Sequence, residues 1–445
     1  MCSTLIFFFY TGNLDFRSYS TNVNNSVKNI NNLPFSDIKK FYQWFVGFAD
    51  AESNFTIHPI YNENKSKVTK FSFMFNIELH IDDLNILILI KDILNIGNIR
   101  INKDKCTFTV SNRDGILVLI QIFDKYNLNT TKYLDYLDFK KAFNLYFNRD
   151  NNLTDLEIKD LFDQILSLKN GMNTKRTDFT MPLIYKIIIT DLWLLGFIEG
   201  DASFFISRTD LDPMFTIELS ESQLPTLLKV KEYLENTLNF DKHSKYKLAN
   251  SKVIGISNSK VRKGKPTVTL VIRNIYVLNN FLIPLLDSMT FLTKKGLDFN
   301  DYKLICSLIY KGSHRIDDIK DLIIKLSYTM NNYRLTTCDT EVELLSKKEM
   351  NKLVTAKATI ENLPDGRVLD LLSNTVISNS LSCVYEVITP AGDELIFDTM
   401  KEVLGIVDVG FRTLKKHLDQ DLRNKDAVII KGYSVKRIPV FHPSN

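Results

Sequence analysis

Two carboxylates at matched positions of a duplicated segment are the residues of this 445-residue chain best suited to do chemistry. Glu52 lies in the segment Trp44–Phe55, and Asp201 lies in the segment Trp193–Phe204. Each segment has an apolar helix pattern containing Gly, then two acids two residues apart, and then a strand pattern. The backbone dipole at a helix C-terminus repels anions. An acid placed there is therefore paired, exposed to water or bound to a cation.

Both predicted helices carry small residues one turn apart. These residues are Gly47 and Ala51 in the first segment, and Gly196 and Gly200 in the second. Small residues at positions i and i+4 leave a groove that lets two helices approach almost backbone to backbone. A core helix with a Gly near its end is the simpler interpretation of one copy. Two copies with their acids in register favour a helix pair in which Glu52 and Asp201 meet at a pseudo-two-fold axis.

The chemistry of such a pair points to a divalent cation. Close carboxylates repel each other unless a proton or a metal ion lies between them. Oxygen ligands without a nearby His or Cys suit Mg²⁺. A symmetric metal pair beside a polar, basic sheet is suited to cleaving phosphodiesters. The other two acids, Asp50 and Glu199, are interpreted as structural carboxylates of a turn or cap.

The elements that position these acids repeat as well. After each acid the sequence predicts two strands, a helix, two more strands and further helices, and the strands Phe75–Leu79 and Phe215–Leu219 correspond. The predicted fold class is α+β, with two pseudo-symmetric αββαββα repeats at residues 37–178 and 187–335. Residues 1–36 are rich in Asn and Ser and are expected to form a flexible leader.

Hydroxyls, amides and Arg on the polar faces of the strands suit contacts to base edges and phosphates. A solvated surface is the alternative for any single strand. The candidate contacts are Asn54, Thr56, Ser72, Asn76, Thr107, Thr109, Arg113, Ser203, Ser207, Thr269 and Arg273. A run of basic residues either contacts a polyanion or forms a solvated face, and the two alternatives are equal. The run consists of Lys245, Lys247, Lys252, Lys260, Arg262, Lys263 and Lys265.

Composition excludes several classes of protein. The five cysteines are scattered, which argues against a zinc site or a disulfide framework and favours a reducing compartment. No apolar run reaches the roughly 18 residues that a membrane span needs. The net charge of +4 is too small to indicate a nucleic-acid binder by itself. Abundant Asn, Ile, Lys, Phe and Tyr suggest an AT-biased genome such as that of an organelle.

The stretches Phe45–Ser53 and Leu194–Ala202 resemble the LAGLIDADG motifs of homing endonucleases and intron maturases. The resemblance extends over residues 37–335. It implies a monomer whose motif helices form the interface between the repeats and whose sheets form a saddle over the DNA major groove. It also implies Mg²⁺-dependent cutting of both strands at a long, pseudo-symmetric site.

The resemblance also implies roles for individual residues. The metal-binding acid of each motif falls on Glu52 and Asp201, and the family usually has Asp there. Glu52 departs from the family by one methylene, so we expect the active site built on it to be the weaker one. Lys132 and Lys295 match the basic residues that stabilise developing charge in the family, and two solvated lysines are the alternative.

The remaining residues divide into two segments. Residues 336–382 are predicted to be a charged, helical connector broken at Leu363–Gly366. Residues 383–445 are predicted to form a small α+β module with a hairpin, a helix broken at Gly405, a second helix from Gly410 to Leu418 and closing strands. This module resembles the helix-turn-helix modules appended to intron-encoded nucleases. Its second helix would direct Arg412, Lys415 and Lys416 toward DNA.

Three functions follow as hypotheses. The first is an intron-encoded, site-specific DNA endonuclease with double-stranded DNA as its partner and Mg²⁺ as its cofactor. The second is a maturase that binds its own intron RNA. The third is a transcription regulator that kept the fold and lost catalysis. The expected location is the mitochondrial matrix.

Overall fold

The computed structural model describes most of the chain after residue 36. The described ranges are 37–65, 67–238, 253–259, 266–340, 342–363, 368–378, 383–419 and 427–439. The predicted leader and all seven cations of the basic run lie outside these ranges. No helix within the described ranges combines the length and apolar character needed to cross a membrane.

The first repeat contains a four-stranded antiparallel sheet with helices on one side. Its main elements are α1 (Ile38–Glu52), β1 (Ser53–Tyr61), β2 (Val68–His80), α2 (Leu84–Leu94), β3 (Asn98–Asn102), β4 (Lys105–Val110), α3 (Arg113–Lys125), α4 (Lys132–Phe147) and α5 (Asp155–Asn170). The strand order is β1-β2-β4-β3. Along β2, Phe71, Phe73 and Phe75 are buried while the residues between them are half-buried. This period-2 burial directs one face of the sheet to the core and leaves the other open.

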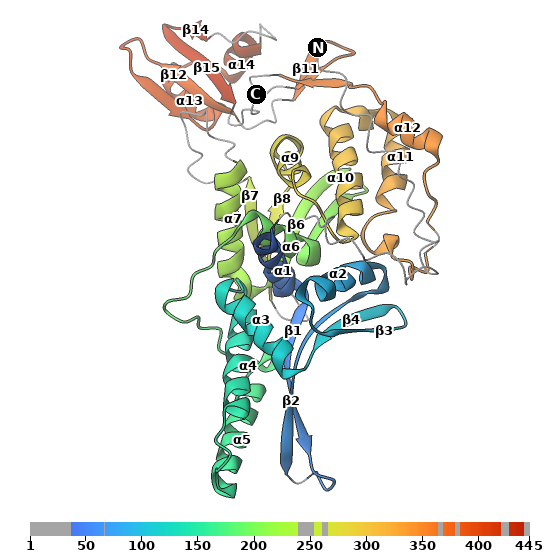
Figure 1. The fold of residues 1–445 in the computed structure, drawn as a ribbon. Coiled ribbons are helices and arrows are strands. Elements are labelled where there is room, and N and C mark those ends of the chain that lie inside the picture. The colour runs from blue at the N-terminus through green and yellow to red at the C-terminus, as the bar shows by residue number, and fades with distance from the viewer. Residues whose placement is uncertain are drawn as a thin grey trace.

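The second repeat has the same order of elements. They are α6 (Asp191–Asp201), β5 (Ala202–Ser207), β6 (Asp212–Ser220), α7 (Leu224–Leu238), β7 (Ile254–Ser259), β8 (Thr267–Ile272), α8 (Ile275–Val277), α9 (Ile283–Asp287), α10 (Lys295–Tyr310) and α11 (Asp317–Ser327). Its sheet order, β5-β6-β8-β7, matches that of the first repeat strand for strand. The predicted α+β fold with two αββαββα repeats is therefore confirmed. Figure 1 shows α1 and α6 side by side at the centre, between the two sheets.

Both central helices run directly into a strand. Asp37 caps the start of α1 by accepting a hydrogen bond from the Lys39 amide at 2.9 Å. Thr190 caps α6 by accepting from the Trp193 amide at 3.2 Å. At the other end, Ser53 and Ala202 are already extended, and no loop separates helix from strand. The last helical residue of each helix is therefore the acid, held at the joint between helix and sheet.

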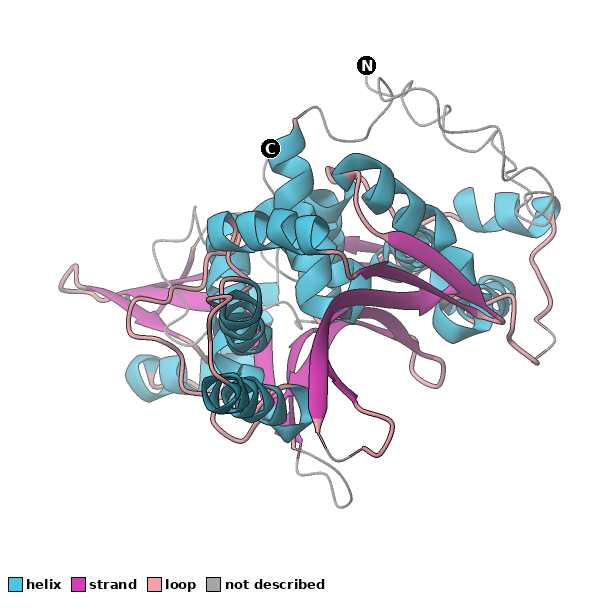
Figure 2. Ribbon diagram, turned by 60° about the horizontal axis from the view of Figure 1, so that its bottom comes forward, coloured by secondary structure: helices cyan, strands magenta, loops and turns pink. Residues whose placement is uncertain are grey.

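An aromatic core joins α1 to the sheet and to α3 of the first repeat. In the first repeat, the Phe45 ring lies 5.9 Å from that of Phe123, and Phe55 lies 5.3 Å from Phe75. All four side chains are almost fully buried. Burying one such side chain stabilises the fold by roughly 1.5–3 kcal/mol. Figure 2 shows helices gathered over the sheets, while the strands curve around an open side.

The predicted helical connector is only partly helical. It contains α12 (Lys347–Val354) and then a three-stranded antiparallel sheet of β9 (Ile360–Asn362), β10 (Val368–Asp370) and β11 (Thr375–Ser378). The strands have three or four residues each, too few to show an alternating pattern in the sequence. Tertiary contacts hold them instead: the Thr359 amide donates to Lys311 O at 3.0 Å, and Arg315 pairs with Asp370 at 2.6 Å.

The C-terminal module packs two helices on a four-stranded sheet of its own. Its elements are β12 (Cys383–Ile388), β13 (Glu394–Phe397), α13 (Met400–Val407), α14 (Phe411–Asp419), β14 (Val428–Ile430) and β15 (Tyr433–Pro439), and the strand order is β13-β12-β15-β14. The predicted break at Gly405 is wrong, because α13 continues to Val407. The helix persists because Val403 and Val407 pack into the small core of the module. Figure 1 shows the module at the opposite end of the molecule from the β1–β2 hairpin.

Candidate active site

The two central helices touch through their small residues. A Cβ atom added to Gly47 would lie 2.0 Å from Trp193 O, and one added to Gly196 would lie 2.2 Å from Trp44 O. A Cβ on Gly200 would lie 2.4 Å from the Cβ of Ala51. All four small residues thus lie at the contact between α1 and α6. The helices could not approach this closely with larger side chains at these positions.

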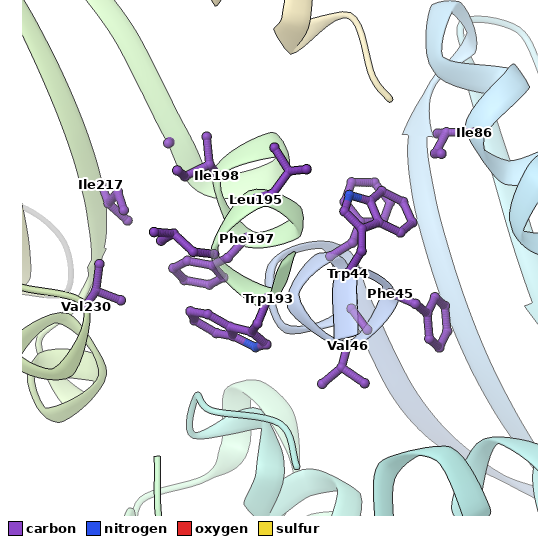
Figure 3. Close-up of a cluster of buried hydrophobic side chains, with 14 of the residues drawn as sticks. Trp44, Phe45, Val46, Ile86, Trp193, Leu195, Phe197, Ile198, Ile217 and Val230 are labelled. Atoms are coloured by element: carbon purple, nitrogen blue, oxygen red, sulfur yellow. The ribbon is translucent and has the colours of Figure 1, made fainter. Parts of the chain in front are cut away.

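Two reciprocal hydrogen bonds cross the same contact. The indole N–H of Trp44 donates to Glu199 Oε2 at 2.6 Å, and that of Trp193 donates to Asp50 Oδ2 at 2.9 Å. Figure 3 shows Trp44 and Trp193 flanking the contact while Phe45 and Phe197 point toward the cores of their own repeats. Each acid is therefore bonded to the tryptophan of the other repeat.

Each of these acids also binds the loop that precedes a lysine. Asp50 accepts hydrogen bonds from the Asn129 amide at 2.6 Å and from the Thr130 hydroxyl at 2.6 Å. Glu199 accepts from the amide and hydroxyl of Thr293, at 2.7 and 3.1 Å. Burial raises the pKa of Asp50, and it raises the pKa of Glu199 to about 7. The interpretation of both as structural acids agrees with this buried, fully bonded setting.

Glu52 and Asp201 lie beside each other at the ends of the two helices. The same Cβ added to Gly200 would lie 2.9 Å from Glu52 Oε1. Burial, followed by the charge of Glu52, raises the pKa of Asp201 to about 7. Burial also raises the pKa of Glu52, and the positive charges of Lys132 and Lys295 oppose that shift. The two carboxyls therefore share one electrostatic environment, in which a proton or a cation relieves their repulsion.

The two lysines lie at the same joint. Lys132 Nζ donates to Ala49 O at 3.0 Å and to Ala51 O at 3.3 Å, at the C-terminal end of α1. Lys295 Nζ donates to Ala202 O at 2.7 Å, just after α6. Burial lowers the pKa of Lys132, and the carboxylates around it oppose that shift. Each ammonium group thus bonds backbone carbonyls at the joint between helix and strand and lies within electrostatic reach of the paired acids.

The donor set fits a hard divalent ion that keeps several waters. Within the described residues, no group of three or more His, Cys, Asp or Glu side chains is arranged to hold a metal. An ion at Glu52 or at Asp201 would therefore take its other ligands from backbone carbonyls, water or substrate oxygens. Mg²⁺ binds in this way, through one or two carboxylates together with water and phosphate oxygens.

A second layer of contacts between the repeats was not predicted from the sequence. Asp83, just before α2, accepts from the Lys294 amide at 2.9 Å, and its charge acts on Glu52. Gln223, just before α7, occupies the corresponding place and accepts from the Thr131 amide at 2.8 Å. Burial raises the pKa of Asp83. Asp83 therefore adds a carboxyl near Glu52, where the matched residue of the second repeat is the amide Gln223.

A cavity opens on the Glu52 side of the joint. Its volume is about 320 Å³, and its lining includes Glu52, Glu78, Asp83 and Lys105. Lys105 Nζ pairs with Glu78 Oε1 at 2.6 Å. The cavity lies between the buried acid and the end of the open face of the first sheet, and Asp104 and Glu199 add further carboxyls to its lining.

Nine of the eleven predicted strand-face contacts lie on the open faces of the two sheets, and Arg273 is exposed immediately after β8. In the first sheet, the residues opposite the core are Asn54, Thr56, Ser72, Asn76, Thr107 and Thr109. In the second sheet they are Ser203, Ser207 and Thr269. Arg113 does not lie with them. It begins α3, and its guanidinium lies 5.4 Å from the centre of the Phe147 ring of α4. Arg113 follows the strand and does not lie on the open face, and a DNA contact by Arg113 stays a prediction.

The open face of the first sheet also contains residues that the sequence analysis missed. His58, Asn98 and Arg100 are exposed and continue the same alternation along β1 and β3. Extending the period-2 pattern to the edge strand would have found them. In the C-terminal module, Arg412, Lys415 and Lys416 are exposed on one side of α14, whose other side buries Leu414 and Leu418.

The family model described as LAGLIDADG endonuclease matches residues 45–143 and 194–306, which contain the two motifs and the sheets after them. A solved structure, the LAGLIDADG homing endonuclease I-GzeII in complex with its DNA target, is similar to 66% of this chain and 99% of that chain. Its TM-score is 0.55 and its sequence identity is 26%. The chain belongs to the LAGLIDADG endonuclease family.

Two curated relatives of this LAGLIDADG protein are fungal. The uncharacterized mitochondrial protein RF1 of Saccharomyces cerevisiae is 27% identical over 330 residues, which is 72% of this chain and 66% of that protein. The probable intron-encoded endonuclease Cox1-I1b of Schizosaccharomyces pombe is 30% identical over 227 residues, which is 47% of this chain and 56% of that protein. The chain thus spans between half and two thirds of the length of these relatives.

Proposed function

We propose that this protein is an intron-encoded, site-specific DNA endonuclease that makes Mg²⁺-dependent double-strand breaks at a long target. One observation carries the proposal: Glu52 and Asp201 are held side by side at the ends of two helices, between two sheets with open polar faces. The family match and the DNA complex of I-GzeII support DNA as the substrate. The mitochondrial and intron-encoded relatives support a mitochondrial intron as the origin.

The acids and lysines at the joint have separate roles in cleavage. Glu52 and Asp201 would each hold a Mg²⁺ ion, which lowers the pKa of a bound water and stabilises charge on the phosphate. Lys132 and Lys295 each place an ammonium group near this pair, where it stabilises the charge that develops on the phosphate. Asp50 and Glu199 orient the loops before these lysines. The buried joint keeps all four charged groups in position before the substrate arrives.

The open faces of the two sheets would read the DNA, and the C-terminal module would add a further contact. Strand residues with hydroxyl and amide groups reach base edges in the major groove. The exposed Arg412, Lys415 and Lys416 on α14 would bind phosphates next to the central site. Removing these three charges should weaken binding to every DNA sequence alike and reduce its dependence on salt.

The decisive experiment is cleavage of the intronless allele by the full-length protein. We expect a double-strand break with Mg²⁺ and none in chelator. We expect no break with the variant in which Glu52→Gln and Asp201→Asn are combined, although that variant should still bind the DNA. Binding of intron RNA without any DNA cleavage across a series of divalent ions would overturn the proposal in favour of a maturase.

A further inference from the structure

The two sheets can be compared residue by residue, because their strand pairings are in the same register. Ser53 lies opposite Ile77 in the first sheet, and Ala202 lies opposite Ile217 in the second. Counting from these pairs, Asn54 corresponds to Ser203 and Thr56 corresponds to Phe205. The same count applies to β2 and β6 and to β4 and β8. Differences between matched positions on the open faces therefore show how the two faces differ in chemistry.

The row of the first sheet nearest the acids is rich in amides. Asn54 lies opposite Asn76, which lies opposite Thr109, which lies opposite Asn98. The Thr109 hydroxyl donates to Asn76 Oδ1 at 2.8 Å, and the Thr56 hydroxyl donates to Asn54 Oδ1 at 3.1 Å. These bonds orient two amides on the open face. An oriented Asn amide is the side chain that pairs with adenine through its N6 and N7 atoms.

The matching row of the second sheet carries no amide. It consists of Ser203, Thr216, Val271 and Gly255. In the next row, Phe205 lies opposite Met214. Phe205 is 43% exposed although its neighbours Phe204 and Ile206 are buried in the core. An apolar strip made of Phe205, Met214 and Val271 thus lies on a face where the first sheet has Thr56, Met74 and Thr109.

We propose that the two sheets read the two halves of the target by different chemistry. The apolar strip of the second sheet contacts the C5-methyl groups of thymines, and the amide row of the first sheet hydrogen-bonds adenines. The major groove presents both features, and apolar side chains are the partners of the thymine methyl. This inference rests on the proposed function, since it assumes that DNA lies along the open faces. If the two sheets contact different bases, the two sides of the cleavage site differ in base composition.

Removing single methyl groups from the DNA tests the inference. Full-length protein in chelator, which binds without cutting, selects its preferred duplex from a randomised library. Each thymine of that duplex is then replaced by deoxyuridine, which differs only by the missing methyl group. We expect some replacements in one half-site to weaken binding, by roughly threefold to fivefold for each buried methyl. Replacements in the other half-site should change the affinity little.

Variants of Phe205, with Thr56→Ser as the control, show whether the apolar strip causes the effect of deoxyuridine. With Phe205→Ser, the deoxyuridine duplexes should bind as well as the thymine duplex, because the apolar contact has been removed from the protein. With Thr56→Ser, the matched change on the first sheet, the methyl effect should persist. Phe205→Leu, which keeps an apolar side chain, should retain part of it. Phe205 is exposed, so these variants are expected to fold, and their thermal unfolding is measured alongside.

The outcomes separate the two proposals. If the wild-type protein selects no sequence and binds no duplex, the proposed endonuclease function fails and this inference fails with it. If the protein selects and binds a duplex but deoxyuridine has no effect, only the inference is overturned. An effect of deoxyuridine that persists undiminished in Phe205→Ser overturns it as well, because the methyl contact then lies elsewhere.

Discussion

The indole of Trp44 on α1 donates a hydrogen bond of 2.6 Å to the buried carboxyl of Glu199 on α6. Glu199 in turn binds the amide and hydroxyl of Thr293, two residues before Lys295. A reciprocal chain runs from Trp193 through Asp50 to Thr130, two residues before Lys132. Each tryptophan therefore links the helix contact to the loop that presents a lysine of the other repeat.

Replacing Trp44 by Phe tests this link. The substitution keeps an aromatic ring but makes it smaller, and Glu199 loses one buried donor, which by itself costs about 1–3 kcal/mol. We expect the urea midpoint to fall without a change in the slope of the transition. Trp193→Phe should have a similar effect, because Trp193 occupies the matching place. An unchanged midpoint in both variants would show that the indole hydrogen bonds contribute nothing to the helix contact.

The closeness of α1 and α6 predicts opposite effects for two Gly→Ala substitutions. Gly196→Ala places a Cβ 2.2 Å from Trp44 O, so the helices must separate, and we expect a loss of several kcal/mol of folding free energy. Gly405→Ala, within α13, meets no atom within 4 Å and should stabilise its helix by up to about 1 kcal/mol. Thermal unfolding of the two variants distinguishes them. Equal shifts of either sign would contradict the close contact.

The pH dependence of stability follows from the raised pKa values of about 7 for Glu199 and Asp201. Between pH about 4 and 7 the folded state binds more protons at these groups than the unfolded chain does. Their contribution therefore makes the metal-free protein less stable as pH rises through this window and levels off above it. Urea unfolding in chelator measures the slope. Asp201→Asn removes one titrating group and should reduce the slope, and an unchanged slope would show that Asp201 does not titrate there.

Loss of either catalytic acid should uncouple the cuts in the two strands. Each acid is proposed to serve mainly one phosphodiester, so Asp201→Asn and Glu52→Gln should each yield nicked DNA from a supercoiled plasmid carrying the target. Glu52→Asp restores the shorter side chain usual in the family. It should increase the rate at which the more slowly cut DNA strand is cleaved. Strand-resolved gels measure the two rates. Equal loss of both cuts in each single variant would show that the two metal sites act as one unit.

The lysines are expected to act on the rate more than on binding. Lys295→Met keeps the length of the side chain but removes the charge, and we expect cleavage to slow by roughly 10²–10³-fold. Lys132→Met should do the same and also lower stability, because Lys132 Nζ caps two carbonyls of α1 while Lys295 Nζ caps one carbonyl. Gel-shift affinity in chelator should change little. If affinity falls as much as the rate does, the lysines bind DNA and do not stabilise the reaction.

The sequence alone determined the duplicated fold and the pairing of Glu52 with Asp201. The local patterns were enough because the helix and strand periods and the Gly spacing repeat in register in both copies. The open strand faces followed from the same alternation. The placement of Arg113 on a strand face, the break at Gly405 and the helical connector were predicted wrongly. Arg113 lies after its strand, and the strands of the connector are too short to show a pattern in the sequence. Helix α13 continues past Gly405 because Val403 and Val407 pack into the core of the module.

Only the tertiary structure decided how the site is held and how its halves differ. The hydrogen bonds from Trp44 to Glu199 and from the Lys294 amide to Asp83 join residues 155 and 211 positions apart. No periodicity records such separations, because they depend on how the two repeats pack against each other. The sequence contains the difference between Asp83 and Gln223, but only the packing of the repeats brings the charge of Asp83 beside Glu52. The electrostatic asymmetry of the site is therefore visible only in the assembled interface.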